Sequence, residues 1–333
     1  MANEPLKVAA IGIGWWSDVL ADAIKRSGKL KIVSCYTRSE GKRNAFAAKY
    51  GCNAAPSLAA VLEDRDIEAV VNTTPNNAHL ETTRAAARAG KHVFLDKPIA
   101  NTIADARALT KACRDAGVVL ALGYQRRKES QFRWIRKQID DGVFGKLMNA
   151  EANISRDRLG QFDLSSWRYT AQGMPGGVML QIGIHYSDVL EYLIGPVKAV
   201  SGRLAQLVLP GDNPDVASLI LEHENGALST LNASYASASE YYAMNIYGKE
   251  ASAYYDLHQG LRILKRGSKH ATPVEWAKND PIVEELEEFA TAVRGGAQPE
   301  MDGERSTASL AVLLAGIRSA REGRRVELAE ILA

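Results

Sequence analysis

The sequence predicts an α/β protein with two domains, in which a doubly wound parallel sheet is followed by an α/β domain with an open, mainly antiparallel sheet. Three observations support this fold class. The chain has 333 residues, more than a single hydrophobic core usually accommodates. Residues 1–123 alternate short apolar runs with longer amphipathic segments, as successive βαβ units do. After residue 123 strand-like alternation prevails, above all in residues 197–264.

The first predicted domain, residues 1–123, contains apolar runs that are too short for helices and too uniformly apolar for half-exposed strands. Such runs are typical of parallel strands that are buried on both faces. The predicted strands are Val8–Ile11, Lys31–Tyr36, Ala69–Asn72, His92–Leu95 and Val118–Leu122. The predicted helices are Ala45–Tyr50, His79–Ala89 and Ile103–Ala116, with Gly51, Gly90 and Gly117 just past their ends as C-terminal caps.

The second predicted domain, residues 124–333, begins with a helix at Ser130–Asp141 and a strand at Met148–Ser155, before a loop region at Leu159–Pro175. The antiparallel sheet is expected to include Ser218–Glu222, Ala227–Ala233 and Ala243–Tyr247, with turns at Asn225-Gly226 and Gly248-Lys249. Two helices, Ile282–Arg294 and Ser306–Arg321, complete the chain, and Gly323 ends the last one. This last helix is a candidate for packing back on the first domain.

Composition and charge exclude several classes of protein. Lys and Arg number 41 against 39 Asp and Glu, and a net charge of +2 gives no field that would steer nucleic acid or an anionic membrane. Cys35, Cys52 and Cys113 lack the paired spacings of a zinc site or a disulfide framework, so we expect reduced thiols and no metal site. The sequence shows no signal-peptide core and no apolar stretch of about 20 residues. We therefore expect a cytoplasmic protein.

A glycine-rich turn follows the first predicted strand. The segment Gly12-Ile13-Gly14-Trp15-Trp16-Ser17 matches the dinucleotide-binding fingerprint, with Ser17 in place of its third glycine. In this motif the first glycine permits a tight turn and the second lets backbone amides approach a diphosphate. The N-terminus of the following helix adds free N–H groups and a partial positive charge. The alternative is a glycine-rich turn that serves the fold alone.

The end of the second predicted strand carries no acidic residue. In dinucleotide-binding domains an acid at this place binds the adenosine ribose, but here the sequence is Tyr36-Thr37-Arg38-Ser39. A guanidinium group with hydroxyl neighbours suits a 2′-phosphate, which favours NADP over NAD. The alternative is that Arg38 begins a solvated helix and stacks on adenine without discriminating between the two.

The fourth predicted strand ends at Asp96-Lys97-Pro98. Because ligands bind beyond the C-terminal ends of strands in an open parallel sheet, we expect Lys97 to point into a site. A desolvated lysine there can exchange a proton with a substrate hydroxyl. A surface lysine with no such role is the competing interpretation.

A second proton-transfer candidate lies in the segment from Gly176 to His185. If this segment opens a helix, Gln181 and His185 are four residues apart and share a face. Histidine can transfer a proton near neutral pH, whereas glutamine can only orient a hydroxyl group. A hydrogen-bonded structural role is the competing interpretation for His185. It is also the expected role of His79, His92, His223, His258 and His270.

These motifs, in this order, resemble those of the Gfo/Idh/MocA family, which includes glucose–fructose oxidoreductase and inositol dehydrogenase. The resemblance covers nearly the whole chain. Further matching segments are Thr74-Pro75-Asn76 with His79, Gly90-Lys91-His92-Val93, Asp96-Lys97-Pro98-Ile99-Ala100, Gly123-Tyr124-Gln125-Arg126-Arg127, Trp167-Arg168, Gly176-Gly177 and Gly183-Ile184-His185-Tyr186-Ser187-Asp188.

The resemblance implies a Rossmann domain followed by an α/β domain whose open sheet forms the interface of a homodimer or homotetramer. It implies that Lys97 is catalytic and that His185 transfers a proton. Two residues depart from the family pattern: Asp96 replaces its usual glutamate, and Gln181 replaces an aspartate, which removes a charged partner of His185.

The resemblance also implies a set of residues that contact the cofactor. These are Gly12, Gly14, Trp15, Trp16, Ser17, Thr37, Arg38, Thr74, Pro75, Asn76, His79, Asp96, Lys97, Gln125, Trp167 and Arg168. Tyr124, Arg127 and Tyr186 are candidates for shaping the substrate site.

The function implied is hydride transfer between NAD(P) and a hydroxyl or carbonyl carbon of a small sugar-like or polyol substrate, with Lys97 and His185 managing the proton. Two alternatives stay open. One is redox-neutral hydrolysis or elimination of glycosides through a transient oxidation, and the other is a dinucleotide-binding sensor without turnover. The sequence does not distinguish a sugar from a polyol, a sugar acid or an aromatic diol.

Overall fold

The structure of the protein, a computed structural model, describes residues 4–161, 163 and 165–333. The chain forms two compact units, of which the first comprises residues 1–125 and 280–307 and the second residues 126–279 and 308–333. The chain first passes from the first unit to the second after residue 125, two residues beyond the expected boundary at residue 123. Residues 280–307, however, return to the first unit, so that a single boundary does not describe the division.

The first unit contains a six-stranded sheet in which every strand runs parallel to its neighbours. The strand order β3-β2-β1-β4-β5-β6 places β1 beside β4, where the direction of winding reverses. All the predicted strands of this domain are present, which confirms the fold class. The strands are β1 (Leu6–Ile11), β2 (Leu30–Tyr36), β3 (Asn53–Ala54), β4 (Ala69–Asn72), β5 (His92–Asp96) and β6 (Leu120–Gly123).

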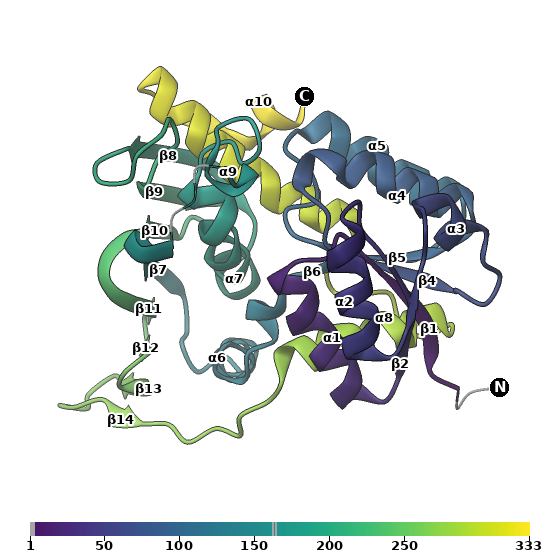
Figure 1. Ribbon diagram of the computed structural model, residues 1–333. Coiled ribbons are helices and arrows are strands. Elements are labelled where there is room, and N and C mark those ends of the chain that lie inside the picture. The colour runs from purple at the N-terminus through teal and green to yellow at the C-terminus, as the bar shows by residue number, and fades with distance from the viewer. Residues whose placement is uncertain (1–3, 162, 164) are drawn as a thin grey trace. The chain divides into compact units, whose positions relative to one another are not determined.

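Helices cover both faces of this sheet (Figure 1). Side chains of α1, α2 and α8 pack on one face in a common apolar cluster with β1, β2 and β4. The helices α4 and α5 contact each other, and α4 packs on β4 and β5. The helices of this unit are α1 (Trp15–Ser27), α2 (Glu40–Tyr50), α3 (Leu58–Glu63), α4 (His79–Arg88), α5 (Ile103–Asp115) and α8 (Pro281–Val293), with a short turn η1 (Asn76–Ala78).

Helix α8 completes the core of the first unit although most strands of the second sheet precede it in the sequence. Leu286 and Phe289 on α8 are fully buried, and the Phe289 ring lies 5.9 Å from that of Phe94 on β5. Burying side chains of this size contributes roughly 1.5–3 kcal/mol each. Burial of apolar surface thus stabilises the packing of this distant segment on the first unit.

The second unit contains a nine-stranded sheet with the order β14-β13-β12-β11-β7-β10-β9-β8-β15. Its pairs are antiparallel except for β7 and β10, which run parallel. The prediction of a mainly antiparallel sheet is therefore confirmed. The strands are β7 (Leu147–Asp157), β8 (Val197–Ala205), β9 (Val216–His223), β10 (Leu228–Ser234), β11 (Ala236–Gly248), β12 (Ala251–Asp256), β13 (Gly260–Lys265), β14 (Thr272–Pro273) and β15 (Val326–Glu327).

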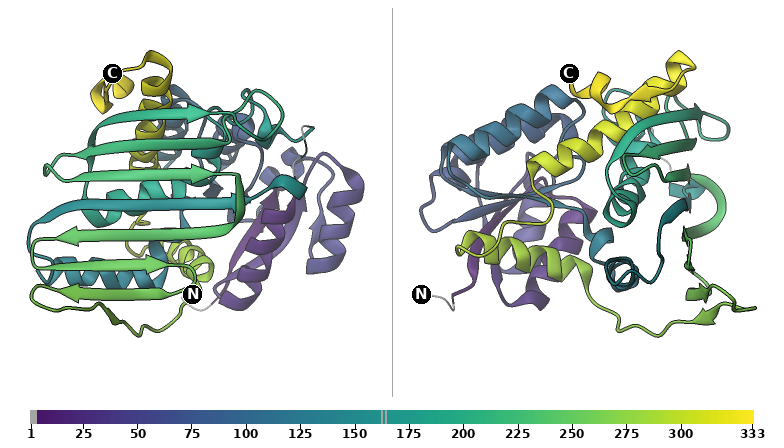
Figure 2. Two further views of the ribbon diagram at one scale, coloured as in Figure 1. Left: turned by 90° about the vertical axis from the view of Figure 1, so that its left-hand side faces the viewer. Right: turned by 180° about the vertical axis from the view of Figure 1, so that it is seen from behind.

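One face of this sheet is open, as the left view of Figure 2 shows. Along β9 and β10 the burial alternates strictly, so that Ser218, Ile220, Thr230 and Asn232 face outward. The other face carries the helices of the unit. These are α6 (Ser130–Asp140), α7 (Ile184–Ile194), most of α9 (Gly303–Glu322) and α10 (Leu328–Leu332), with short turns η2 (Gln125–Lys128), η3 (Leu159–Gln161), η4 (Trp167–Tyr169) and η5 (Met179–Gly183).

The start of helix α2 and the turn before His185 differ from the predicted helices. Helix α2 begins at Glu40 rather than near Ala45, because the Ser39 side chain caps it by accepting a hydrogen bond from the Lys42 amide. The segment before His185 is helical, but its first turn, η5, is a π-helical turn. Residues 162 and 164 of the predicted loop at Leu159–Pro175 lie outside the described residues.

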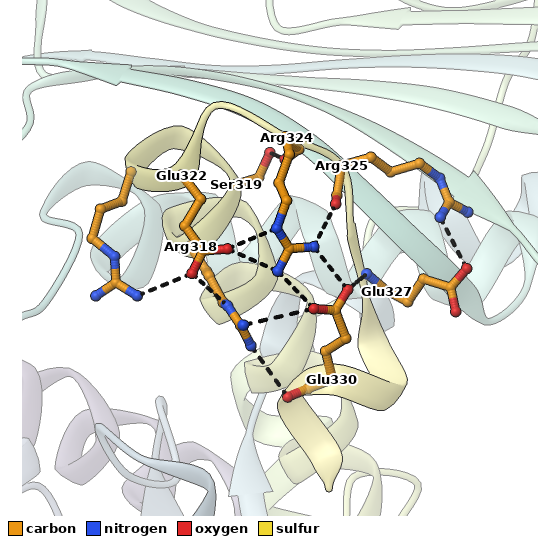
Figure 3. A network of polar contacts seen from close by, with 8 residues as sticks. Arg318, Ser319, Glu322, Arg324, Arg325, Glu327 and Glu330 are labelled. Carbon is orange, nitrogen blue, oxygen red and sulfur yellow. Dashed lines mark hydrogen bonds and ion pairs between the residues drawn. The ribbon is translucent and has the colours of Figure 1, made fainter.

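A network of arginine and glutamate side chains links the end of α9 to β15 and α10 (Figure 3). The Arg324 guanidinium lies 2.7 Å from Glu330 and 2.8 Å from Glu322. The Arg325 guanidinium lies 2.7 Å from Glu222 on β9. Pairs that are this exposed stabilise little one by one, but together they hold β15 in register with β8.

No helix in the described part of the chain is long and apolar enough to cross a lipid bilayer.

Candidate functional site

The turn after β1 is built around Gly12. Its φ of +84° belongs to the left-handed region, and a Cβ atom at this position would lie 2.4 Å from the Thr74 amide nitrogen. The Gly12 amide donates to Tyr36 O at 3.0 Å, and the Thr73 hydroxyl donates to Gly12 O at 2.8 Å. Only glycine therefore fits here, between the ends of β2 and β4.

At Gly14 the protein itself does not require glycine. This residue precedes α1 in an extended conformation that any residue can adopt, and a Cβ atom here would meet no protein atom within 4 Å. Its amide donates to the Ser17 hydroxyl at 2.8 Å, and that hydroxyl donates back to Gly14 O at 2.6 Å. The open space beside Gly14 and the unpaired first amides of a helix are the two features that a bound diphosphate needs. The residues present thus fit the phosphate end of a dinucleotide.

The loops after β4 and β5 are locked together by His79. Its Nε2 lies 2.8 Å from Thr74 O and its Nδ1 lies 3.0 Å from Pro98 O. His79 is 1% exposed, and burial lowers its pKa. The structure therefore places His79 beneath the loops, where it positions Thr74 and Pro98 and has no atom left for a cofactor.

Asn72 and Asn76 hold the rest of the loop after β4. Asn72 accepts hydrogen bonds at Oδ1 from the Thr74 amide at 3.1 Å and the Thr74 hydroxyl at 2.7 Å. Asn76 is buried and donates to Asn101 Oδ1 at 3.1 Å. Side-chain hydrogen bonds thus fix the Thr74-Pro75-Asn76 backbone.

Lys97 stands one residue beyond β5. Asp96 ends that strand opposite Gly123 on β6, and both Asp96 and Lys97 are partly exposed. Gly12, Thr74 and Lys97 thus all follow the C-terminal ends of strands in one parallel sheet. This edge of an open parallel sheet is where such folds bind ligands.

Arg38 is exposed just beyond the end of β2. The Arg43 guanidinium donates to Thr37 O at 3.0 Å and lies 6.0 Å from the Tyr36 ring. This edge of the sheet therefore carries two guanidinium groups and no acid before Glu40, the first residue of α2.

Two further observations concern the cofactor contacts expected in the first unit. Gln125 Oε1 is a buried acceptor with no hydrogen-bond partner among the residues that the structure describes, so a donor from a bound group would satisfy it. Trp15 is 60% exposed at the start of α1, with its ring 5.3 Å from that of Trp16. Trp15 is thus accessible to a ligand at this helix end.

In the second unit, His185 lies at the start of α7 and is 6% exposed. Gln181 lies in the preceding π-helical turn and is partly exposed. Turns of this kind are rare and frequently mark functional sites. The Trp167 ring, in η4 of the same unit, stacks under the Arg168 guanidinium at 4.6 Å.

Gly176 and Gly177 set the position of the helix that carries His185. A Cβ atom on Gly176 would lie 2.3 Å from Ile317 Cδ1, and one on Gly177 would lie 2.3 Å from Pro214 O. The Val178 amide donates to Pro214 O at 3.1 Å. The glycine pair therefore serves close packing against α9 and the loop before β9.

The three candidates for shaping the substrate site are core residues, because each is buried and engaged. Tyr124 is 1% exposed, and its hydroxyl accepts from Ser306 at 3.0 Å. Arg127 forms a buried bidentate pair with Asp188, with Nε 3.0 Å from Oδ2. Tyr186 is fully buried, with its ring 5.9 Å from that of Phe132. The Tyr186 hydroxyl is buried without a hydrogen-bond partner among the described residues, and a role of the three residues in shaping a substrate site stays a prediction.

The sequence did not predict several residues whose hydrogen bonds fix the loops of the candidate site. Thr73 fixes the glycine turn and Asn72 fixes the next loop, although both read as ordinary strand-end residues. Asn213, Asp215 and Tyr235 line a pocket with Arg168 in the second unit. No motif links these residues, and only the pairing of β8, β9 and β10 brings them together.

Comparisons with known proteins match both parts of the chain. The model described as "Oxidoreductase family, NAD-binding Rossmann fold" matches residues 6–124, and the model described as "GFO/IDH/MocA C-terminal domain" matches residues 132–254.

Relatives align along almost the full chain. The chain is 27% identical to 1,5-anhydro-D-fructose reductase of Ensifer adhaerens, over 92% of this chain and 93% of that protein. It is 26% identical to myo-inositol 2-dehydrogenase of Thermotoga maritima, over 98% and 100% of the two chains. A crystal structure from Desulfitobacterium hafniense, provisionally described as an NADPH-dependent oxidoreductase, is 32% identical over 100% of both chains, with a TM-score of 0.95.

Proposed function

Because this chain belongs to the GFO/IDH/MocA oxidoreductase family, we propose that it transfers a hydride between a nicotinamide dinucleotide and a hydroxyl or carbonyl carbon of a small sugar-like or polyol substrate. The family assignment confirms the resemblance drawn from the sequence motifs. The relatives act on an anhydro sugar and on an inositol, as their names state. The observation that carries the proposal is the turn at Gly12, with open space at Gly14 and a helix N-terminus behind it.

When bound, the dinucleotide supplies the nicotinamide ring that accepts or donates the hydride. The residues of this chain bind and orient it. The first amides of α1 hold the diphosphate, and the Thr74-Pro75-Asn76 backbone, fixed by Asn72 and His79, lines the cofactor. Because hydrogen bonds from Asn72 and His79 already fix the Thr74 loop, little ordering of that loop is needed on binding.

Lys97 in the first unit and His185 in the second are our candidates for managing the substrate proton. During oxidation they take up the hydroxyl proton as the hydride leaves, and in the reverse direction they protonate the carbonyl oxygen. General acid–base catalysis of this kind contributes roughly 10²–10⁴-fold in rate. Gln181 does not titrate, so it can orient a hydroxyl but takes no proton.

A screen of polyols and aldoses with both NAD and NADP tests this function. The absorbance of reduced nicotinamide and the consumption of substrate are followed in the same samples. We expect both to change together. Substrate loss without net reduction would instead indicate a redox-neutral hydrolase or eliminase, and cofactor binding without any turnover would indicate a sensor.

We further propose that NADP is preferred over NAD. The support is the exposed Arg38 at the end of β2, with no acid at the place where the 2′-hydroxyl of NAD would be bound. The Desulfitobacterium hafniense protein, provisionally described as NADPH-dependent, is consistent with this choice.

Replacing Arg38 by alanine is expected to weaken NADP binding by about 10- to 100-fold, since hydrogen bonds to charged groups contribute about 1.5–3 kcal/mol. NAD binding should change little. Isothermal titration with both dinucleotides measures this, and Arg84→Ala on an exposed part of α4 is the matched control. Equal losses for both dinucleotides would show that Arg38 contacts the shared adenosine and does not discriminate.

We also propose that the open face of the second sheet joins copies of the chain into a homodimer or homotetramer. On this face the large apolar side chains of Ile220 and Leu228 are 50% and 49% exposed. Sedimentation equilibrium gives the mass directly. A monomer at micromolar concentration would refute this assembly.

A further inference from the structure

His79 lies between two loops of the first unit that have different tasks in the proposed reaction. The strands β4 and β5 are parallel neighbours, so the loops that follow them leave the same edge of the sheet side by side. The loop after β4 carries Thr74, whose backbone lies against Gly12. The loop after β5 begins with Lys97. One loop therefore lines the proposed cofactor site, and the other carries the proton-transfer candidate.

The imidazole ring of His79 contacts one loop with each of its nitrogens. Nε2 lies 2.8 Å from Thr74 O, whereas Nδ1 lies 3.0 Å from Pro98 O and 3.3 Å from Ile99 O. Pro98 directly follows Lys97 in the chain. Because the ring is rigid and only 1% exposed, it sets the distance between the backbone at Thr74 and the backbone next to Lys97.

This spacing does not depend on the protonation of His79. Burial lowers the pKa of the ring and the charge of Lys97 lowers it as well, although the contacts with the three carbonyl groups oppose this. The ring is therefore neutral near pH 7, and its single N–H donates to one of the two loops. A second proton would let it donate to both. In either state the ring lies between the same carbonyl groups.

A second side-chain contact joins the same two loops. Asn76, in η1 after β4, donates from Nδ2 to Oδ1 of Asn101, in the loop after β5, at 3.1 Å. Asn76 is 4% exposed, and Asn101 is partly exposed. Two links at different points restrain the relative position of the loops more than either link alone. All of these residues belong to the first unit.

We propose that His79 is a positioning residue, which holds the cofactor-lining loop and the turn at Lys97 at the spacing that turnover requires. The nicotinamide ring and the proton-transferring amine have to meet one substrate carbon and its oxygen. A misplacement of about 1 Å can cost roughly 10²-fold in rate. His79 acts through the backbone of both loops, because its nitrogens face carbonyl groups of the protein. This inference rests on the proposed function, since it concerns the cofactor and the lysine of that reaction.

Two amide variants separate the two contacts of the ring. The amide of His79→Asn occupies the place of Nδ1, so it keeps the contact with Pro98 and loses the one with Thr74. The longer His79→Gln reaches the place of Nε2, so it keeps Thr74 and loses Pro98. We expect Kd for NAD and NADP to rise about 3- to 10-fold in His79→Asn, with kcat at saturating dinucleotide unchanged. In His79→Gln we expect unchanged Kd and a kcat lowered about 10- to 100-fold.

Titration calorimetry gives Kd, and kcat is measured on the polyol or aldose with the highest turnover in the screen. A third measurement needs neither substrate nor cofactor. Acetic anhydride modifies accessible amines, and peptide mass spectrometry gives the rate for each lysine. Relative to the exposed Lys111, acetylation of Lys97 should accelerate about 3-fold in His79→Gln, because a hydrogen bond that holds its turn is lost. It should keep the wild-type rate in His79→Asn.

His223 on β9 is the matched control. It is 3% exposed, with Nδ1 2.7 Å from Gly195 O and Nε2 2.7 Å from Ser229 Oγ, so it is as buried and as fully engaged as His79. His223→Asn and His223→Gln should lower Tm, as the His79 variants do. They should leave Kd for both dinucleotides and the acetylation of Lys97 unchanged.

Two outcomes overturn this inference. One is wild-type Kd, kcat and Lys97 acetylation in both His79 variants, and the other is equal changes in the two variants, as a general loosening of the fold would cause. If neither variant folds, Asn101→Ala breaks the second link at a partly exposed position. It should raise Kd and accelerate acetylation of Lys97 about 3-fold, and no change in either would equally overturn the inference. The proposed function fails separately, if the wild type binds neither NAD nor NADP.

Discussion

Turnover of the Lys97→Met variant is expected to fall by about 10³-fold, within the range that general acid–base catalysis contributes. Methionine keeps an unbranched chain of similar length but has no amine to exchange a proton. The variant should still fold and bind cofactor, because Lys97 follows β5 and the proposed diphosphate-binding turn follows β1. Single-turnover rates of nicotinamide reduction at saturating substrate measure the effect.

A control variant and a measurement of cofactor affinity complete this experiment. Lys111→Met on an exposed part of α5 is the matched control and should keep full activity. Quenching of tryptophan fluorescence, to which the exposed Trp15 contributes, should report unchanged cofactor affinity in Lys97→Met. If Lys97→Met retained full activity, the assignment of Lys97 to the proton transfer would be wrong.

Gly12→Ala is expected to abolish measurable cofactor binding, while Gly14→Ala should leave the fold intact. An alanine at Gly12 has to adopt a φ of +84° and places its methyl group 2.4 Å from the Thr74 amide nitrogen. The turn must then open, at a cost of about 1–3 kcal/mol for the backbone alone. At Gly14 the φ of −160° suits alanine, and the protein offers no clash within 4 Å.

The two glycine variants therefore separate folding from binding. Thermal denaturation should show a lower Tm for Gly12→Ala and an unchanged Tm for Gly14→Ala. Titration with dinucleotide should show weaker binding for Gly14→Ala as well, because its methyl group occupies the space beside the first helical amides. Wild-type affinity in Gly14→Ala would place the diphosphate elsewhere.

The sequence was most informative where local chemistry decides the structure. The apolar runs predicted the strands of the first sheet, and Gly51, Gly90 and Gly117 marked helix ends because each adopts a positive φ there. The glycine turn was also predictable, since a strand, a tight turn and a helix N-terminus follow one another along the chain. Each of these features depends on residues that are close in sequence.

Features that depend on distant contacts were not predictable in the same way. Helix α8 was expected as a helix, but its place in the first core follows from the fit of Phe289 against Phe94. Strands β14 and β15 have two residues each, too few for any periodicity. The pocket around Tyr235 joins loops that no motif connects, so its chemistry emerges only from the folded chain.

The margins of the second sheet bear on how copies of the protein can assemble. At one margin stands β14 and at the other β15, each with two residues. Such short strands offer little backbone for a further strand to extend, which disfavours growth by strand addition at β14 and at β15. Association is then left to the broad face of the sheet between β14 and β15. When two copies meet there about a twofold axis, each uses the same surface, and the contact forms a closed assembly. We therefore expect discrete particles of fixed size, with no tendency toward fibres.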